Sequence, residues 1–178
     1  MRNQLETAFG NCKYPTKCTC SSKDSFETTT QKEFFIIDEE GEVPVRIVSE
    51  KGNSHLTVKN ELGKEICLVK TDNCLLREET KVCDCILFDD KQLVLAELKA
   101  SNSGTRPVKR KKAKEQLIAT IQLLQSKGID IKSYRTVALI CFKSHEPRII
   151  NTADNSQRAN FFQDYKVHLE EKNVFSFS

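Results

Sequence analysis

In the first hundred residues, short apolar runs separated by polar residues are typical of β-strands. Turn-forming segments such as Asp38–Gly41 and Lys51–Asn53 separate these runs, so we expect β-hairpins from Ser25 to about Val69. Strands continue beyond this region as far as Lys99. The expected strands cover 34–37, 43–48, 56–58, 65–69, 74–76, 82–88 and 92–99.

The hydrophobic period changes after residue 108. Apolar residues between Lys109 and Ser126 recur at steps of three and four, which predicts a helix of roughly four to five turns. Pro107 precedes this helix, and Lys127-Gly128 ends it. The apolar run 136–142 does not alternate, which indicates a strand buried on both faces. The other expected elements are a helix over 2–9, a loop over 10–25, a helix over 157–165 and strands over 167–169 and 174–177.

The order of strands, helix and strand predicts an α/β fold with a mixed central β-sheet flanked by helices. The 178 residues suit one domain, 1–178, with its core at about 65–142 and an N-terminal β-rich extension at about 25–65. No segment approaches the ~20 apolar residues that span a bilayer. The first ten residues lack the apolar segment of a secretory signal. We therefore expect a cytoplasmic protein without a membrane partner.

Charge adds information through its distribution, because the formal net charge is only +3. Between Ser101 and Lys114 the chain carries six basic residues and no acidic ones. Such a run can neutralise nucleic-acid phosphates, although a solvated loop and helix start would have the same composition. The candidate nucleic-acid-binding residues are Arg106, Lys109, Arg110, Lys111, Lys112 and Lys114.

The chain has eight cysteines, but without an export signal their number does not imply disulfides. Cysteines within apolar runs are expected to be small core residues: Cys67, Cys83, Cys85 and Cys141. Cys12, Cys18 and Cys20 lie in a polar segment and could bind zinc, with Cys74 as a fourth ligand. Their spacing matches no standard zinc finger, so free thiols are the simpler interpretation.

Charged side chains interrupt the apolar strands of the segment 81–100 at Asp84, Glu97 and Lys99. Buried charges are costly unless they are paired or bind a cation. Glu97 and Lys99 share a strand face because they are two residues apart. If Asp90-Lys91 forms the loop, Asp84 lies opposite Glu97 with Cα atoms about 5 Å apart, whereas a three-residue loop without a bulge puts it on the other face.

Two carboxylates on one face can bind a hard cation such as Mg²⁺ or Mn²⁺, which activates water and a phosphodiester. A neighbouring lysine can orient or deprotonate the attacking water and offset charge in the transition state. The simpler alternative is a salt bridge between Glu97 and Lys99 at a strand end. The preceding Asp84 and the following amphipathic helix with its basic start favour the catalytic interpretation.

This set of residues resembles the PD-(D/E)XK, or restriction-endonuclease-like, nuclease superfamily. The motif consists of Asp84, twelve further residues and then Glu97-Leu98-Lys99, and the resemblance covers roughly Glu65 to Phe142. It implies a core made of a helix, a three-stranded meander, a helix and a further strand, here with an extra N-terminal β-rich insertion. Cys83 stands where the family name has proline.

The resemblance also implies roles for individual residues. Asp84, Glu97 and Lys99 would be catalytic, with Asp84, Glu97 and Leu98 as ligands of Mg²⁺ or Mn²⁺. Gln116 matches the helical glutamine that some branches carry. An upstream acid would complete the metal site, with Glu6 on the first helix as the candidate and Glu61 and Glu65 as alternatives.

We therefore expect a metal-dependent nuclease that acts on nucleic acid, with DNA favoured over RNA. Small members of this superfamily serve in bacterial restriction, repair and antiviral defence. The resemblance implies a homodimer or a complex with a partner protein, and weak sequence preference. One alternative is a catalytically inactive nucleic-acid-binding or assembly subunit of the same fold. Another is an interaction module built on zinc-binding cysteines, in which the carboxylates are merely structural.

Overall fold

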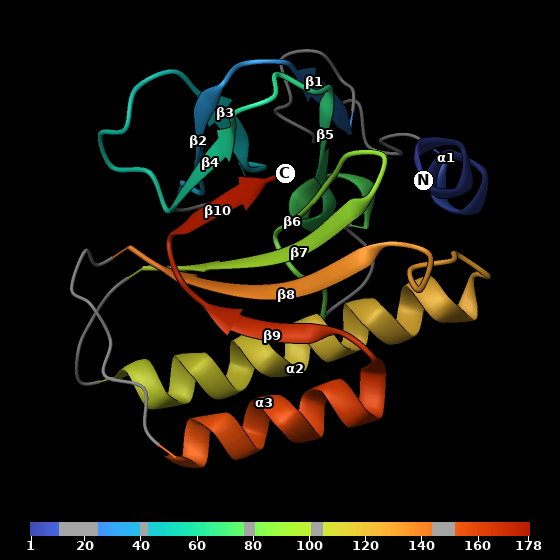
Figure 1. Ribbon diagram of the computed structural model, residues 1–178, viewed down its shortest axis with the longest axis vertical. Coiled ribbons are helices and arrows are strands. Elements are labelled where there is room, and N and C mark those ends of the chain that lie inside the picture. The colour runs from blue at the N-terminus through green and yellow to red at the C-terminus, as the bar shows by residue number, and fades with distance from the viewer. Residues whose placement is uncertain (11–24, 40–42, 77–80, 101–104, 144–151) are drawn as a thin grey trace.

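The structure is a computed structural model that describes residues 1–10, 25–39, 43–76, 81–100, 105–143 and 152–178 (Figure 1). The helices are α1 (Arg2–Phe9), α2 (Arg106–Ser126) and α3 (Thr152–Tyr165), and the turn η1 covers Thr71–Leu75. The first strands are β1 (Phe26–Thr29), β2 (Glu33–Ile37), β3 (Arg46–Val48), β4 (Leu56–Asn60) and β5 (Ile66–Lys70). The later strands are β6 (Cys85–Phe88), β7 (Gln92–Lys99), β8 (Arg135–Phe142), β9 (His168–Glu171) and β10 (Val174–Phe177).

The larger sheet has the strand order β1-β5-β6-β7-β8-β9. Strands β5, β6 and β7 form an antiparallel meander, and α2 then crosses over to β8, which pairs parallel to β7. Strand β9 adds a further parallel strand beside β8. The fold is therefore mixed α/β, as the order of apolar patterns predicts.

A second, four-stranded sheet has the order β10-β4-β2-β3. Strands β2, β3 and β4 come from the N-terminal β-rich region and pair antiparallel, as expected for hairpins. Strand β10 pairs parallel to β4, although the two are far apart in sequence. The expectation of closing strands is confirmed, but the pairing of β10 with the N-terminal region has no signal in its own sequence.

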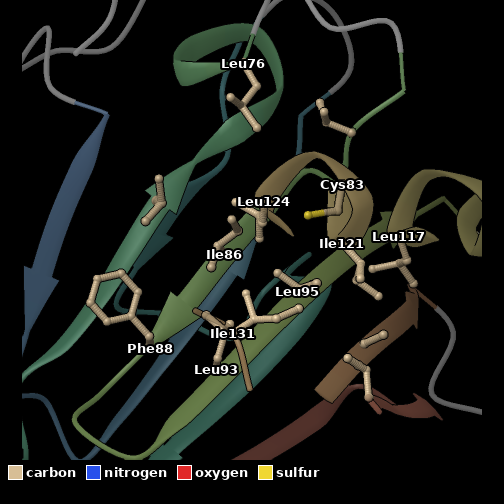
Figure 2. Close-up of a cluster of buried hydrophobic side chains, with 14 of the residues drawn as sticks. Leu76, Cys83, Ile86, Phe88, Leu93, Leu95, Leu117, Ile121, Leu124 and Ile131 are labelled. Carbon is tan, nitrogen blue, oxygen red and sulfur yellow. The ribbon is translucent and has the colours of Figure 1, made fainter. Parts of the chain in front are cut away.

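Both faces of the larger sheet are covered, which explains the continuous apolar sequence of β7. Leu93 and Leu95 belong to a core shared with α1 and α2, whereas Val94, Ala96 and Leu98 belong to a core shared with the second sheet. Figure 2 shows part of the first core, in which α2 contributes Leu117, Ile121 and Leu124. Helices α2 and α3 run side by side beneath the sheet, and the second sheet lies on its other side (Figure 1).

Several expected boundaries differ from the structure. Helix α2 begins at Arg106 rather than Lys109, because Pro107 is tolerated in the first helical turn. Helix α3 begins at Thr152 rather than at residue 157. Strand β3 begins only after Pro44, which cannot donate a ladder hydrogen bond.

The strand expected over 74–76 is wrong. This segment belongs to η1, in which Asn73 adopts a left-handed conformation with φ 55° and turns the chain. Strand β6 begins at Cys85 rather than Val82, because the segment before it is held by side chains instead of a ladder. Within the described residues, no helix is long and apolar enough to cross a membrane.

Candidate functional site

The hairpin between β6 and β7 determines how Asp84 and Glu97 are related. Asp89 N donates to Gln92 O at 3.1 Å, and the Asp89 side chain accepts hydrogen bonds from the amides of Lys91 and Gln92. Asp90 and Lys91 therefore form the loop, which is the shorter of the two loops considered. The ladder pairs Cys85 with Ala96, so one further step places Asp84 opposite Glu97.

Asp84 lies just before β6, where its side chain, rather than its backbone, bonds to the neighbouring strand β7. Its Oδ2 accepts a hydrogen bond from the backbone amide of Leu98 at 2.5 Å. The residue is 6% exposed. Burial raises the pKa of Asp84 from 3.8 to about 7, although Lys99 and the Leu98 amide act in the opposite direction. The carboxyl is thus held in place and is poorly solvated.

Glu97 is completely buried and forms an ion pair with Lys99 through Oε1. Burial raises the pKa of Glu97 well above its ordinary value, and the charge of Asp84 raises it further. Burial lowers the pKa of Lys99, but Glu97 and Asp84 outweigh this effect, so the pKa of Lys99 is raised. Lys99 therefore keeps its proton near neutral pH.

Two carboxylates that the sequence interpretation missed, those of Asp72 and Asp38, act on the pKa of Asp84. Asp72 follows β5 within η1, and the backbone amides of Thr71 and Asp72 donate to Asp84 O at 3.3 and 3.4 Å. The charge of Asp72 raises the pKa values of both Asp84 and Glu97. Asp72 therefore lies close enough to Asp84 and Glu97 for its charge to act on both.

Asp38 is the second missed carboxylate and comes from the other sheet, directly after β2. Burial raises its pKa to about 6, Lys99 lowers it, and Asp72 raises it. Its charge in turn raises the pKa of Asp84. Asp38 and Asp72 share one feature of the sequence: each follows the end of an apolar strand within two residues.

Gln116 anchors the segment that leads into Asp84. Its Nε2 donates to Val82 O at 3.0 Å. One turn further along α2, Thr120 Oγ1 accepts from Cys83 N at 2.8 Å and donates to Gln116 O at 2.9 Å. In the structure, Gln116 therefore positions the backbone before Asp84.

Unsatisfied polar atoms concentrate among the candidate site residues. Among the described residues, the buried side-chain atoms without a hydrogen-bond partner belong to Glu97, Arg106 and Gln116. These atoms are both Glu97 oxygens, Arg106 Nε and Gln116 Oε1. Glu97 Oε1 nevertheless lies in the ion pair with Lys99. Buried polar groups in folded proteins are generally satisfied, so such a group needs an explanation. The Glu97 and Gln116 oxygens lack a donor or cation, and Arg106 Nε lacks an acceptor.

The three glutamates considered as the upstream acid, Glu6, Glu61 and Glu65, lie in other parts of the structure than Asp72. Glu6 forms an exposed pair with Arg2 on α1 at 2.8 Å. Glu61 and Glu65 are exposed and precede β5, whereas the opposite end of β5, at Lys70, pairs with Cys85 beside Asp84. The charge of Asp72 raises the pKa values of Asp84 and Glu97, whereas Glu6 is not among the charges that act on them.

The basic residues at the start of α2 divide into two groups. Arg106 and Arg110 both pair with Glu171 of β9, and Arg106 also stacks over the Phe142 ring. Lys109 donates to the Ala100 carbonyl at 2.9 Å, and Lys114 lies over the Phe161 ring. Lys111 and Lys112 are exposed. These two lysines are therefore the most accessible to a polyanion.

The residues present fit a hard divalent cation that has few protein ligands. Within the described ranges, no group of three or more His, Cys, Asp or Glu side chains forms a complete metal site. Mg²⁺ usually keeps several waters and uses one or two carboxylates together with substrate phosphates. Glu97 Oε2 has no donor, and Asp84 faces the same strand end. Leu98 packs its side chain in the core, so only its carbonyl oxygen could bind a cation.

The cysteines provide no zinc site within the described residues. Cys12, Cys18 and Cys20 lie in the segment 11–24, outside the described residues. Cys74 is buried, and its sulfur contacts Ser25 Oγ at 3.2 Å. The cysteines expected in the core are free and buried, as predicted: Cys67, Cys83, Cys85 and Cys141.

Comparison of the chain with family models, with curated proteins and with solved structures finds no match. A functional assignment therefore depends on the site itself. That site combines the buried carboxylates of Asp84 and Glu97 with a protonated Lys99 at the end of β7.

Proposed function

We propose that the protein is a metal-dependent nuclease that hydrolyses phosphodiester bonds through Asp84, Glu97 and Lys99. The observation that carries this proposal is the completely buried Glu97, which has an Oε2 without a donor and lies opposite a second buried carboxylate. Lys99 offers one positive charge for two buried carboxylates, so an arrangement that served stability alone would leave part of their repulsion uncompensated. A divalent cation would compensate it.

The topology gives further support. The order β5-β6-β7, α2 and β8 agrees with the meander, helix and further strand that the resemblance to PD-(D/E)XK nucleases implies. Asp84 enters the middle strand of the meander, and Glu97 and Lys99 end the third. We therefore propose a restriction-endonuclease-like core, with the second sheet as an addition to it.

Asp84 and Glu97, with the Leu98 carbonyl, would hold Mg²⁺ or Mn²⁺. When bound, the cation would polarise the phosphodiester and lower the pKa of water. Lys99 keeps its proton, so it would donate to the phosphate and offset the charge that develops as water oxygen attacks phosphorus. The attacking water would release one proton to solvent, the ester P–O bond would break, and the leaving oxygen would take up a proton from solvent.

Nucleic acid is the favoured substrate because the exposed Lys111 and Lys112 lie on the helix that follows the Lys99 strand. Helix α2 packs on the sheet face that carries Leu93 and Leu95, and strand alternation puts Glu97 on that face. A phosphate chain held along the start of α2 would therefore reach the carboxylates from the same side. We favour DNA over RNA.

Cleavage of plasmid, linear duplex, single-stranded DNA and RNA, with Mg²⁺ or Mn²⁺ and with EDTA, tests the proposal. Wild-type protein should cleave at least one substrate only with metal. Lys99→Ala and Glu97→Gln should lose this activity while keeping the fold, as judged by circular dichroism. Lys127→Ala removes an exposed lysine at the far end of α2 and serves as the matched control.

Two results would contradict the proposal. If Lys99→Ala cleaves as fast as wild type, another site or a contaminant is responsible. If folded wild type binds DNA but cleaves no substrate with either metal, the inactive nucleic-acid-binding subunit is the better description.

A further inference from the structure

The second sheet brings a buried histidine to the end of the molecule that carries Lys99. His55 immediately precedes β4 and is 4% exposed. Its backbone amide donates to Ile36 O at 2.8 Å, which fixes the residue at the end of the β2–β4 ladder. His55 plays no part in the proposed chemistry described so far.

Hydrogen bonds link this end of the second sheet to the strand ends that carry the candidate site. Thr57 N donates to Asn173 O at 2.8 Å, and the Asn173 side chain donates to Phe142 O at 2.5 Å. Phe142 pairs with Lys99 in the parallel ladder of β7 and β8. The amide of Lys143 donates to Lys99 O at 3.0 Å, so Lys143 follows directly at the same strand ends.

The charges around His55 agree with this placement. Burial, together with the charges of Lys143 and Lys99, lowers the pKa of His55 to about 4. The ring is therefore neutral at neutral pH. Lys99 is also the partner of Glu97, so its charge acts on both the histidine and the carboxylates.

The backbone fixes which nitrogen of the ring carries the hydrogen. Asp38 N donates to His55 Nδ1 at 3.3 Å, so Nδ1 is an acceptor. A neutral imidazole with an acceptor Nδ1 carries its hydrogen on Nε2. Among the described residues, none accepts a hydrogen bond from Nε2. A fixed donor beside two lysine charges suits an anionic ligand.

We propose that His55 Nε2–H donates a hydrogen bond to a non-bridging oxygen of the scissile phosphodiester, which makes His55 a further catalytic residue supplied by the second sheet. This inference rests on the proposed nuclease function, because it requires a phosphate at the end of β7, within reach of both the carboxylates and the second sheet. Lys99, which is paired with Glu97, and His55 would then contact the phosphate from two different sheets. The N-terminal β-rich region would be part of the active site rather than an appendage.

Two substitutions separate donation by Nε2 from a structural role of Nδ1. Asn at position 55 places an oxygen near the Nδ1 position, so it keeps the acceptor for Asp38 N but has no donor at Nε2. Gln at position 55 places an amide N–H near the Nε2 position but lacks the acceptor. Lys51→Ala, in the turn before β4, removes an exposed charge from the same region and serves as the control.

The measurement is kcat on a fluorophore- and quencher-labelled DNA at saturating Mg²⁺. We expect His55→Asn to lower kcat by about tenfold or more, because a hydrogen bond to a charged group is lost. His55→Gln should stay within about threefold of wild type by the same reasoning. A structural role would give the reverse order. Equal rates in the two variants, whether high or low, would overturn the proposal.

The test remains informative if the wild type does not cleave DNA. Fluorescence anisotropy of labelled DNA with Ca²⁺ in place of Mg²⁺ then measures the phosphate contact directly. Weaker binding by His55→Asn than by His55→Gln supports the contact even if the nuclease proposal fails. Equal affinities reject the contact, and they leave the nuclease proposal to be judged on Lys99→Ala and Glu97→Gln.

Discussion

The carboxylate of Asp84 accepts a hydrogen bond from the backbone amide of Leu98 at 2.5 Å, and Leu98 is the residue between Glu97 and Lys99. One side chain thus closes the open end of the β6–β7 hairpin at the position where the charged residues of β7 begin. The contact ties the position of Asp84 to that of its two partners. It also keeps a second carboxylate next to the buried Glu97.

Replacement of Asp84 should change how stability depends on pH. Between pH 3.8, its ordinary pKa, and about 7, the folded protein keeps a proton on Asp84 that the unfolded chain has released. The free energy of unfolding of the metal-free wild type should therefore fall as the pH rises through this window. Asp84→Asn should make this slope shallower, while Glu97 and Asp38 keep part of it, and above pH 7 it should be more stable than the wild type by several kcal/mol.

Urea unfolding in EDTA at several pH values between 4 and 8 measures this effect. Asn at position 84 can still accept the Leu98 amide, so the comparison isolates the charge. Asp90→Asn, an exposed acid in the neighbouring loop, is the control and should keep the wild-type slope. Parallel slopes for wild type and Asp84→Asn would contradict the burial of a titrating carboxyl.

Metal binding should depend on Glu97 and should appear as stabilisation. A ligand at 100 times its Kd stabilises the folded state by about 2.7 kcal/mol. Wild-type Tm should rise with Mg²⁺ or Mn²⁺, because the cation relieves the repulsion between Glu97 and Asp84. Glu97→Gln should have the higher Tm without metal and should not respond to it. An equal metal response in both proteins would rule out Glu97 as a ligand.

Substitutions at Gln116 and Thr120 should separate activity from stability. Thr120→Val removes the buried acceptor of Cys83 N and should destabilise the protein by about 1–3 kcal/mol. Gln116→Leu removes a partly buried anchor together with an unsatisfied oxygen, so stability should change by less than about 1 kcal/mol. Its kcat should fall, because the segment before Asp84 is no longer fixed. Unchanged kcat in Gln116→Leu would argue against this positioning role.

The two groups of basic residues on α2 should respond differently to substitution. Lys111→Ala combined with Lys112→Ala should weaken DNA binding and lower the salt slope by about 2, one for each lost phosphate contact. Arg110→Ala leaves the buried Glu171 with one partner fewer and should cost about 1–3 kcal/mol of stability. Anisotropy titrations at several salt concentrations and urea unfolding measure the two effects. An unchanged salt slope in the lysine variant would exclude these residues from the interface.

The sequence was most informative where local pattern determines the structure. The strand 92–99 was predicted with its observed bounds, because a continuous apolar run that ends in charges is unusual. The facing positions of Asp84 and Glu97 followed once the loop was known to be Asp90-Lys91. Asp38 and His55 could not be related to this site from sequence, because only tertiary packing brings the second sheet to the end of β7. The turn at Asn73 was missed because a positive φ in a non-glycine residue has a weak sequence signal.

The ladder between β4 and β10 has a consequence for folding kinetics. It joins distant parts of the chain, and beside it the Lys64 side chain contacts Ser178 across a separation of 114 residues. Contacts of such long range form slowly, because the loop-closure entropy must be overcome first. Refolding should therefore restore helical circular dichroism from α2 before it orders the second sheet and, with it, His55. A chain between these two stages would be compact and helical, but its second sheet and His55 would not yet be ordered.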